Sequence, residues 1–246
     1  MKKTAVRIKA NPVTITPEQV QFFDENGYVV IPGVFEPTDC EEIIRAAEEH
    51  AAEDFAVYLN IHRDVPLFLE IVRDPVLVNM IKAVQRSKIV GLNDQFLYKK
   101  PGTTYAKQSW QPHQDNAYPK APRGAYMQLH ISLVASDREN GCLYAYPGSQ
   151  REELLPYEYV QSWREKPDAD GITRPGWRVQ VPPQYECVDV TAPQGAVTMQ
   201  HGHLIHGSHP NLTRDRARSQ YSIAYINEGV PFEQGKGSKK IPIAVE

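Results

Sequence analysis

The chain has 246 residues, of which 41% are hydrophobic and 23% are charged, and this balance is typical of a folded domain rather than of a disordered or collagen-like chain. A net charge of −3 gives no excess of basic residues for binding a nucleic-acid backbone, so we expect neither DNA nor RNA as a partner. No run approaches about 18 apolar residues and the opening segment is charged, so we expect a cytoplasmic protein without a membrane partner.

The first predicted element is a short helix with a clear start signal. Thr16 can cap it, Pro17 suits the first helical position, and Gln19 completes a capping box. We expect this helix to end near Glu25, where the apolar periodicity stops.

A strand and two further helices complete the expected helical flank, which spans about 16–86. The apolar run 28–31 lies between a glycine and a proline, as is typical of a short strand. Apolar residues then recur at three- and four-residue steps over about 38–54 and about 65–86, which predicts an amphipathic helix in each range.

After residue 88 the sequence becomes a series of short β-type segments separated by Pro, Gly, Asn and Asp. Such spacing favours a sandwich or barrel over alternating α/β units. Strands are expected near 89–99, 126–134, 143–147, 187–190, 196–201 and 220–227. We therefore expect one domain, 1–246, with a β core at about 88–227 and a long insertion at about 151–185, which matches neither period.

The cysteines do not indicate a site. Cys40, Cys142 and Cys187 are an odd number and lack metal-type spacing. Neither a disulfide framework nor a cysteine-based zinc site is therefore expected.

Histidines carry the main chemical signal, because five of the eight fall in two short segments. His113 stands two residues before Asp115, so an extended segment would put both side chains on one face. One further histidine would complete a 2-His-1-carboxylate site, which leaves open positions on Fe(II), whereas a structural zinc site is closed by four ligands. Without its surroundings, such a tripeptide is more typical of a surface turn in which the aspartate caps a neighbour.

Four histidines compete for the third position: His201, His203, His206 and His209. If the segment 196–206 is one regular strand, His206 shares a face with Thr198 and Gln200, while His201 and His203 face the other way. A bulge at the glycine inside this segment would change that parity.

Several motifs surround the tripeptide in a specific order. They are ENGYVVIPGVF at 25–35, FLYKKPG at 96–102, PHQD at 112–115, NGCL at 140–143 with PGS at 147–149, and HGS at 206–208 with Asn211. In this order they resemble the phytanoyl-CoA dioxygenase-like family of Fe(II)/2-oxoglutarate oxygenases over nearly the whole chain. The resemblance implies a mainly β, cupin-like jelly roll (double-stranded β-helix) with flanking helices.

The resemblance also implies roles for individual residues. The metal ligands would be His113, Asp115 and His206, and the last is the histidine directly before Gly207 and Ser208. Ser208 would help to hold the distal carboxylate of 2-oxoglutarate.

An arginine is expected on the same carboxylate, because its planar fork suits bidentate pairing. The usual spacing of the family falls on Ala217, so the loop holds an extra residue and Arg218 is the best match, with Arg216 as the alternative. His130 stands where the family can place an aromatic residue beside the cosubstrate; it could equally be a core histidine.

The implied activity uses Fe(II), 2-oxoglutarate and O2, and couples release of succinate and CO2 to oxidation of a substrate C–H bond. The carboxylate of Asp115 favours hydroxylation, because halogenating relatives have a small residue there. We expect a small polar or anionic metabolite as substrate, and residues that could line its pocket are Gln111, Asn116, Tyr118, Lys120, Arg123, Trp163, Arg174, Trp177 and Arg178.

Two other readings stay open. A cupin-like metal-dependent isomerase or hydrolase could use the same ligands without the arginine, and a jelly-roll binding protein could lack the metal altogether. The sequence gives no prediction of oligomeric state.

Overall fold

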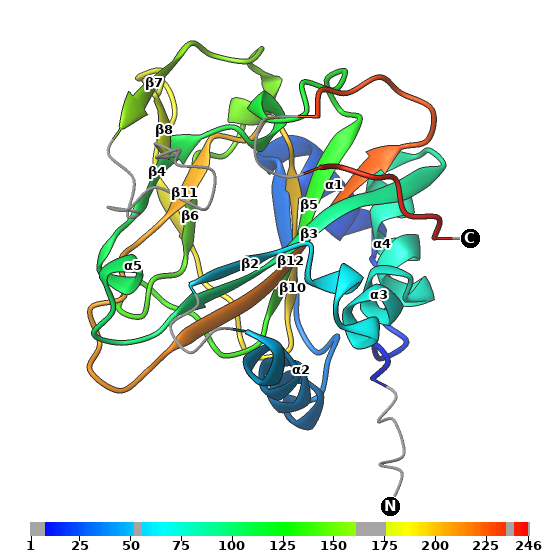
Figure 1. Cartoon of the computed structure of the whole chain (residues 1–246). Helices are drawn as coiled ribbons and strands as arrows, with labels where there is room; N and C mark the ends of the chain where they lie inside the picture. The colour runs from blue at the N-terminus through cyan, green and yellow to red at the C-terminus, as the bar shows by residue number, and fades with distance from the viewer. Residues whose placement is uncertain (1–7, 52–55, 161–175, 235–238, 246) are drawn as a thin grey trace, which may run out of the picture.

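The computed structural model describes residues 8–51, 56–160, 176–234 and 239–245 (Figure 1). Two antiparallel sheets form its centre, one with the strand order β1-β10-β5-β12-β3-β2 and one with the order β4-β11-β6-β9. Neither sheet closes into a barrel within the described ranges, so the fold is the expected jelly roll in the form of a sandwich. No helix in those ranges is long and apolar enough to cross a membrane.

The strands of the six-stranded sheet are β1 (Tyr28–Ile31), β2 (Val57–Leu59), β3 (Ile89–Lys99), β5 (Tyr126–Ser132), β10 (Val197–His201) and β12 (Arg218–Asn227). Those of the four-stranded sheet are β4 (Trp110–His113), β6 (Leu143–Ala145), β9 (Val188–Val190) and β11 (His206–Ser208). The helices are α1 (Pro17–Asn26), α2 (Pro37–His50), α3 (Pro66–Val72), α4 (Pro75–Gln85) and α5 (Thr104–Lys107), with 3-10 turns η1 (Ile61–Arg63), η2 (Asp115–Ala117) and η3 (Ser149–Arg151).

The first helix and strand follow the sequence expectation. Thr16 accepts a hydrogen bond from the backbone N–H of Gln19, whose side chain reaches back to the cap, and both bonds of the capping box are present. Gly27 ends α1 in the left-handed conformation at φ 79°, which a glycine adopts without a side-chain clash. The chain can therefore turn directly into β1.

The helix expected over 65–86 is wrong as a single element, because the structure has α3 and α4 in its place. Pro75 has no backbone N–H for a continuing helix, and it disfavours the helical conformation at the residue before it. Asp74 instead caps α4 by accepting from the Val76 N–H at 2.9 Å. The helix expected to about 54 also ends earlier, at His50.

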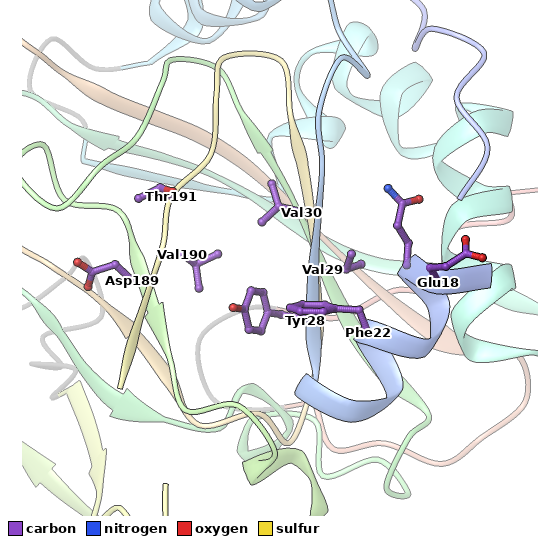
Figure 2. A pocket seen from close by; sticks show the side chains of 9 residues that line it. Glu18, Phe22, Tyr28, Val29, Val30, Asp189, Val190 and Thr191 are labelled. Atoms are coloured by element: carbon purple, nitrogen blue, oxygen red, sulfur yellow. The ribbon is translucent and has the colours of Figure 1, made fainter. Parts of the chain in front are cut away.

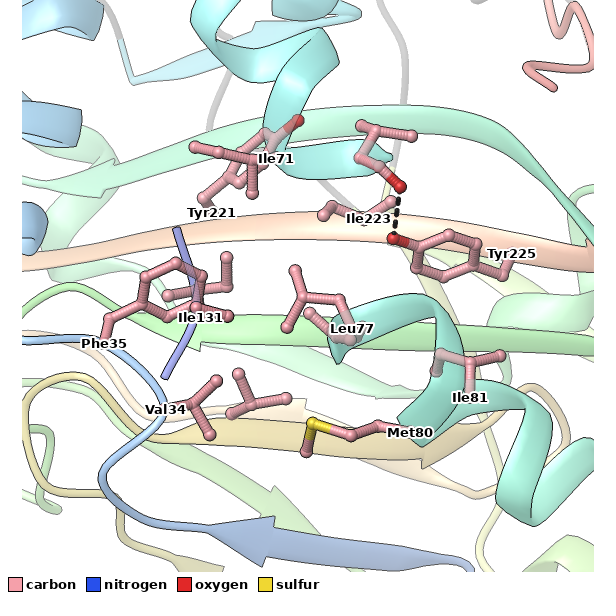
Figure 3. Packing of buried hydrophobic residues seen from close by; sticks show 14 of the residues in the cluster. Val34, Phe35, Ile71, Leu77, Met80, Ile81, Ile131, Tyr221, Ile223 and Tyr225 are labelled. Carbon is pink, nitrogen blue, oxygen red and sulfur yellow. Dashed lines mark hydrogen bonds between the residues drawn. The ribbon is translucent and has the colours of Figure 1, made fainter. Parts of the chain in front are cut away.

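Helices α1 to α4 cover one face of the six-stranded sheet (Figure 1). The central strand β12 presents Tyr221, Ile223 and Tyr225 to them, and all three are fully buried. The Tyr225 hydroxyl donates to the Val72 carbonyl at 2.9 Å. Figure 3 shows Leu77 packed over the same face as Ile223 and Tyr225. This apolar layer is the largest hydrophobic core of the described chain.

The opposite face of the same sheet is buried but polar. Strand alternation sends Arg218, Gln220 and Ser222 of β12 away from the helices, and their exposed fractions are 4% or less. His130 of β5 pairs in register with Ser222 on this face. We call this the cavity face of the six-stranded sheet.

The premise that 196–206 is one strand is wrong. Strand β10 ends at His201 in the six-stranded sheet, and β11 begins at His206 in the four-stranded sheet. The N–H of Gly202, in the turn between them, donates to the Tyr126 carbonyl at 3.0 Å. Parity along one strand therefore cannot select the metal histidine, although His206 and Gln200 do meet, across the space between the sheets.

Other boundaries shift by a few residues. Strand β5 ends two residues before the expected limit and β12 begins two residues earlier than expected, at Arg218. The insertion 151–185 contains a two-stranded hairpin of β7 (Tyr157–Val160) and β8 (Gly176–Val179), which the sequence periodicity did not indicate.

Candidate metal centre

Three potential ligands converge between the two sheets. His113 ends β4, Asp115 begins η2, and His206 begins β11 directly opposite His113 in the strand register. The Nε2 of His113 lies 3.3 Å from Asp115 Oδ1, and the Nε2 of His206 lies 3.6 Å from Asp115 Oδ2. One ligand atom from each residue lies within 4.8 Å of the others, and all three residues are buried. We call His113, Asp115 and His206 the triad.

Backbone carbonyls fix the orientation of both imidazoles. The Nδ1 of His113 lies 2.7 Å from the Gln111 carbonyl, and the Nδ1 of His206 lies 3.0 Å from the Leu204 carbonyl. A carbonyl can only accept, so each Nδ1 carries a proton, and Nε2 is the atom through which each ring would bind a metal. This is the usual arrangement behind a metal-binding histidine.

The electrostatics of the triad suit a cation. Burial opposes ionisation of Asp115, but the two histidines outweigh it and hold the pKa of the carboxyl well below its usual range. Burial lowers the pKa of His206 to about 4, so its imidazole is neutral. For His113 the lowering by burial is outweighed by Asp115, and its pKa lies above the usual value. A bound cation would replace the protons that the triad otherwise shares.

The other three histidines of the second segment lie outside the triad. His203 contacts the Asn116 amide at 2.7 Å through Nε2. The ring of His201 accepts from the His203 backbone N–H at 3.0 Å. His209 pairs with Asp189 at 2.6 Å on the four-stranded sheet.

The two candidate arginines occupy different surroundings. Arg216 is exposed and forms ion pairs with Asp137 at 2.7 Å and Glu139 at 2.8 Å. Arg218 is 2% exposed, on the cavity face, where its guanidinium donates to the Gln220 side chain. Only Arg218 therefore lies where a buried anion could meet it.

Lys99 is a buried basic residue that the sequence analysis missed. Burial and the neighbouring Arg218 guanidinium lower the pKa of Lys99 well below its usual value, so an anion beside the pair would favour the charged form. Lys99 lies opposite Arg218 in the register of β3 and β12 and has no exposed surface. Its ammonium donates to Ser208 Oγ at 2.9 Å, to the Gln108 carbonyl at 3.2 Å and to the His209 carbonyl. Within the described ranges no carboxylate forms an ion pair with Lys99 or Arg218. The sequence does contain a signal for this residue, because Lys99 belongs to the FLYKKPG motif at 96–102.

His130 has one buried nitrogen without a partner. The Gln220 amide donates to its Nδ1 at 2.9 Å, and the Ser222 hydroxyl lies 2.8 Å from the same atom. Nε2 therefore carries the proton, yet it is buried and makes no hydrogen bond. Burial lowers the pKa of His130 to about 3, so the ring is neutral. An unpartnered buried donor of this kind suggests an absent ligand.

The expected pocket residues are only partly brought together. Tyr118 follows η2 and stacks on Trp177 of β8, with ring centroids 4.4 Å apart, and Tyr157 of β7 covers the other face of Trp177 at 4.2 Å. The insertion hairpin is thus attached beside the triad. Trp163 and Arg174 lie outside the described residues, and Lys120 is exposed, in an ion pair with Glu233 at 3.0 Å.

An open surface pocket lies away from the triad. Figure 2 shows it between α1, β1 and β9, with Phe22, Tyr28, Val30 and Val190 among its lining residues. None of the triad, Arg218, Lys99 or His130 lines it, so it is not the site described above.

Comparisons with known proteins identify the family of the chain. A model of the family "Phytanoyl-CoA dioxygenase (PhyH)" matches residues 23–219. The peroxisomal phytanoyl-CoA dioxygenase of Rattus norvegicus is 23% identical over 255 aligned residues, which cover 93% of this chain and 73% of the rat protein.

Solved structures show the same fold at low identity. The 2-oxoglutarate-dependent carbocyclase SnoK of nogalamycin biosynthesis superposes with a TM-score of 0.73 and 21% identity, covering 96% of this chain and 97% of SnoK. The epimerase SnoN, in complex with Fe3+, 2-oxoglutarate and nogalamycin RO, has a TM-score of 0.73 and 17% identity, covering 92% of this chain and 94% of SnoN.

Proposed function

The chain belongs to the phytanoyl-CoA dioxygenase family, and on that basis we propose that His113, Asp115 and His206 are the protein ligands of its iron. The protein is an Fe(II)- and 2-oxoglutarate-dependent dioxygenase. The observation that carries the ligand assignment is the buried triad itself, whose imidazoles are held through Nδ1 so that both Nε2 atoms face the Asp115 carboxylate. Two histidines and one carboxylate are the donor set that leaves positions open on Fe(II) for a chelating cosubstrate and oxygen.

The buried cations support a place for the cosubstrate. Arg218 on the cavity face and Ser208 of β11 offer donors, Lys99 adds a second buried basic group that is bonded to Ser208 Oγ at 2.9 Å, and no carboxylate of the described chain neutralises Arg218 or Lys99. Burial of two like charges is costly without an anion, which the distal carboxylate of 2-oxoglutarate would supply. We assign His130 to the same ligand, because its Nε2–H is a buried donor without an acceptor.

With O2 as the oxidant, bound iron and 2-oxoglutarate would supply the oxidising chemistry: one oxygen atom would go to the succinate formed with CO2, and the other to the substrate. The protein residues position the reactants and exclude water. The triad fixes one end of the cosubstrate site, and Arg218 with Lys99 fixes the other. The polar side chains between them are almost fully buried, so charges there interact more strongly than in water.

We propose that the reaction is hydroxylation of a small polar or anionic metabolite. Asp115 supplies the carboxylate that halogenating relatives lack. The insertion hairpin lies beside the triad through the Tyr118–Trp177 stack, so substrate contacts are expected from it. Acyl-CoA is less favoured, because the sequence offers no basic cluster for its phosphates. The cytoplasmic location stays a prediction.

The test is an anaerobic titration of the Fe(II) protein with 2-oxoglutarate. Chelation should produce a metal-to-ligand charge-transfer band, and addition of oxygen should then yield succinate. The His113→Ala variant should lose iron and the band. Unchanged iron loading in this variant would refute the ligand assignment.

The same assay separates the rival functions. An isomerase or hydrolase on the same ligands would turn over without oxygen or 2-oxoglutarate, and a metal-free binding protein would take up no iron. A saturating cosubstrate concentration that produces no band would count against the oxygenase assignment.

A further inference from the structure

A second group of metal-type side chains lies outside the triad. Cys142, Asp189 and His209 each place one potential ligand atom within 4.8 Å of the other two. Asp189 Oδ1 and His209 Nε2 lie 2.6 Å apart. These residues are far apart in the sequence, which is why cysteine spacing gave no sign of them.

The strand register brings the three residues onto one face of the four-stranded sheet. Ser208 of β11 pairs with Leu143 of β6, and the next residue, His209, donates its backbone N–H to the Cys142 carbonyl at 3.0 Å. Asp189 of β9 pairs with Tyr144, two residues along β6 from Cys142. Because side chains alternate along a strand, all three lie on the face opposite to that of His206 and Ser208.

We propose that Cys142, Asp189 and His209 form a second metal site, for Zn²⁺ or a similar divalent ion such as Co²⁺. A thiolate, an imidazole and a carboxylate are the ligands that zinc prefers, and three protein ligands leave a fourth tetrahedral position for water. The two anionic ligands balance the charge of the ion. This site rests on its own residues and does not depend on the iron assignment.

An ion can reach the site from solvent. The side chains of Asp189 and His209 are 29% and 16% exposed, while Cys142 lies buried beneath them. Arg138 contacts both oxygens of Asp189 at 3.2 Å, but its side chain is 70% exposed and free to move aside. Burial raises the pKa of the Cys142 thiol to about 11, so metal binding must displace that proton.

Cobalt titration of the iron-free full-length chain tests the proposal. A thiolate bound to Co²⁺ gives an intense charge-transfer band in the near ultraviolet, and the triad cannot produce it because it contains no sulfur. We expect this band in the unaltered protein, together with one cobalt equivalent beyond that held by the triad. Added Zn²⁺ should remove the band.

Variants separate this site from the iron centre and from the other thiols. Cys142→Ser should lose the band and one cobalt equivalent, whereas His113→Ala should keep the band and lose the other equivalent. Cys187→Ser is the matched control, because Cys187 is exposed, two residues before Asp189 on β9, and not among the three ligands. It should keep the band.

Any other pattern overturns the ligand set. A band that persists in Cys142→Ser, or one that Cys187→Ser removes, would assign the thiolate elsewhere. Absence of the band in the unaltered protein would refute the site. If Cys142→Ser does not fold, His209→Gln and Asp189→Asn serve instead, and each should weaken cobalt binding as followed by the same band.

Discussion

The two faces of the six-stranded sheet differ in what their side chains do. Along β12, Tyr221 and Ile223 point toward the helices and pack in the apolar core, while Arg218, Gln220 and Ser222 point to the opposite, polar side of the sheet. Both sets are almost fully buried. Adjacent residues of one strand therefore have different roles, because side chains on one face stabilise the fold and those on the other face stay polar for a ligand.

Buried charge is treated differently on the two faces. On the helix side, Asp94 is fully buried and bonded to His62 Nδ1 at 2.7 Å and to the Tyr221 hydroxyl. On the cavity side, Arg218 and Lys99 are equally buried but have no carboxylate partner among the described residues. Asp94 therefore has its partners within the protein, whereas Arg218 and Lys99 are placed to bind an anion that comes from outside.

The largest effect is expected where the cavity face meets the triad. His206→Ala should abolish iron binding and succinate formation, because it removes one of three ligands, while the free energy of unfolding changes little. Iron content and cosubstrate turnover measure this. His201→Ala is the control and should keep its iron, since His201 lies outside the triad. Iron retained at full occupancy in His206→Ala would contradict the assignment.

Substitutions of two adjacent residues of β12 should differ in their effect on the stability of the fold. Ile223→Ala removes a fully buried side chain from the core and should lower the free energy of unfolding by about 2–5 kcal/mol. Ser222→Ala removes only a hydroxyl next to His130 and should cost less than about 1.5 kcal/mol. Urea denaturation measures both. If the two costs were equal, the proposed division between the faces would be wrong.

Removal of Arg218 should weaken the binding of 2-oxoglutarate without lowering the stability of the fold. Arg218→Gln should raise the 2-oxoglutarate concentration for half-saturation by about 10- to 100-fold, the range expected for hydrogen bonds to a charged group. The free energy of unfolding should not fall, because a buried cation without an anion is itself costly. Arg216→Gln, on the surface, should leave half-saturation unchanged. A similar rise in both variants would indicate a general charge effect.

The smallest effect is expected at the helix cap beneath the apolar face. Asp74→Ala removes the acceptor for the Val76 N–H and for the buried Ala10 N–H, and it should lower the free energy of unfolding by about 1–2 kcal/mol. Iron and 2-oxoglutarate affinities should stay unchanged, as measured by the titration described above. A loss of either affinity would show that the helix layer and the cavity are coupled.

Local signals in the sequence were sufficient for some elements. The capping box at Thr16 and the strand 89–99 depend on neighbouring residues, and both are confirmed. The break at Asp74 and Pro75 was equally local but was overlooked, because apolar periodicity continues across it.

The site depended on information that no single segment contains. His113 and His206 become neighbours only because β4 and β11 pair, and the chain crosses from one sheet to the other just before His206. Lys99 likewise becomes a candidate site residue only because β3 and β12 place it opposite Arg218 in the strand register. Ordered motifs selected His206, the histidine that lies beside His113 and Asp115, whereas strand parity selected it from a wrong premise.

The position of the triad and of the buried cations on opposite layers has a mechanical consequence. His113 and His206 belong to the four-stranded sheet, while Arg218 and Lys99 belong to the six-stranded sheet. In the proposed arrangement, one cosubstrate molecule holds both layers at once and acts as a removable cross-link. Each turnover, by cutting 2-oxoglutarate to succinate, would shorten that link, so amide hydrogen exchange in β11 and β12 should slow with the cosubstrate and quicken again with the product.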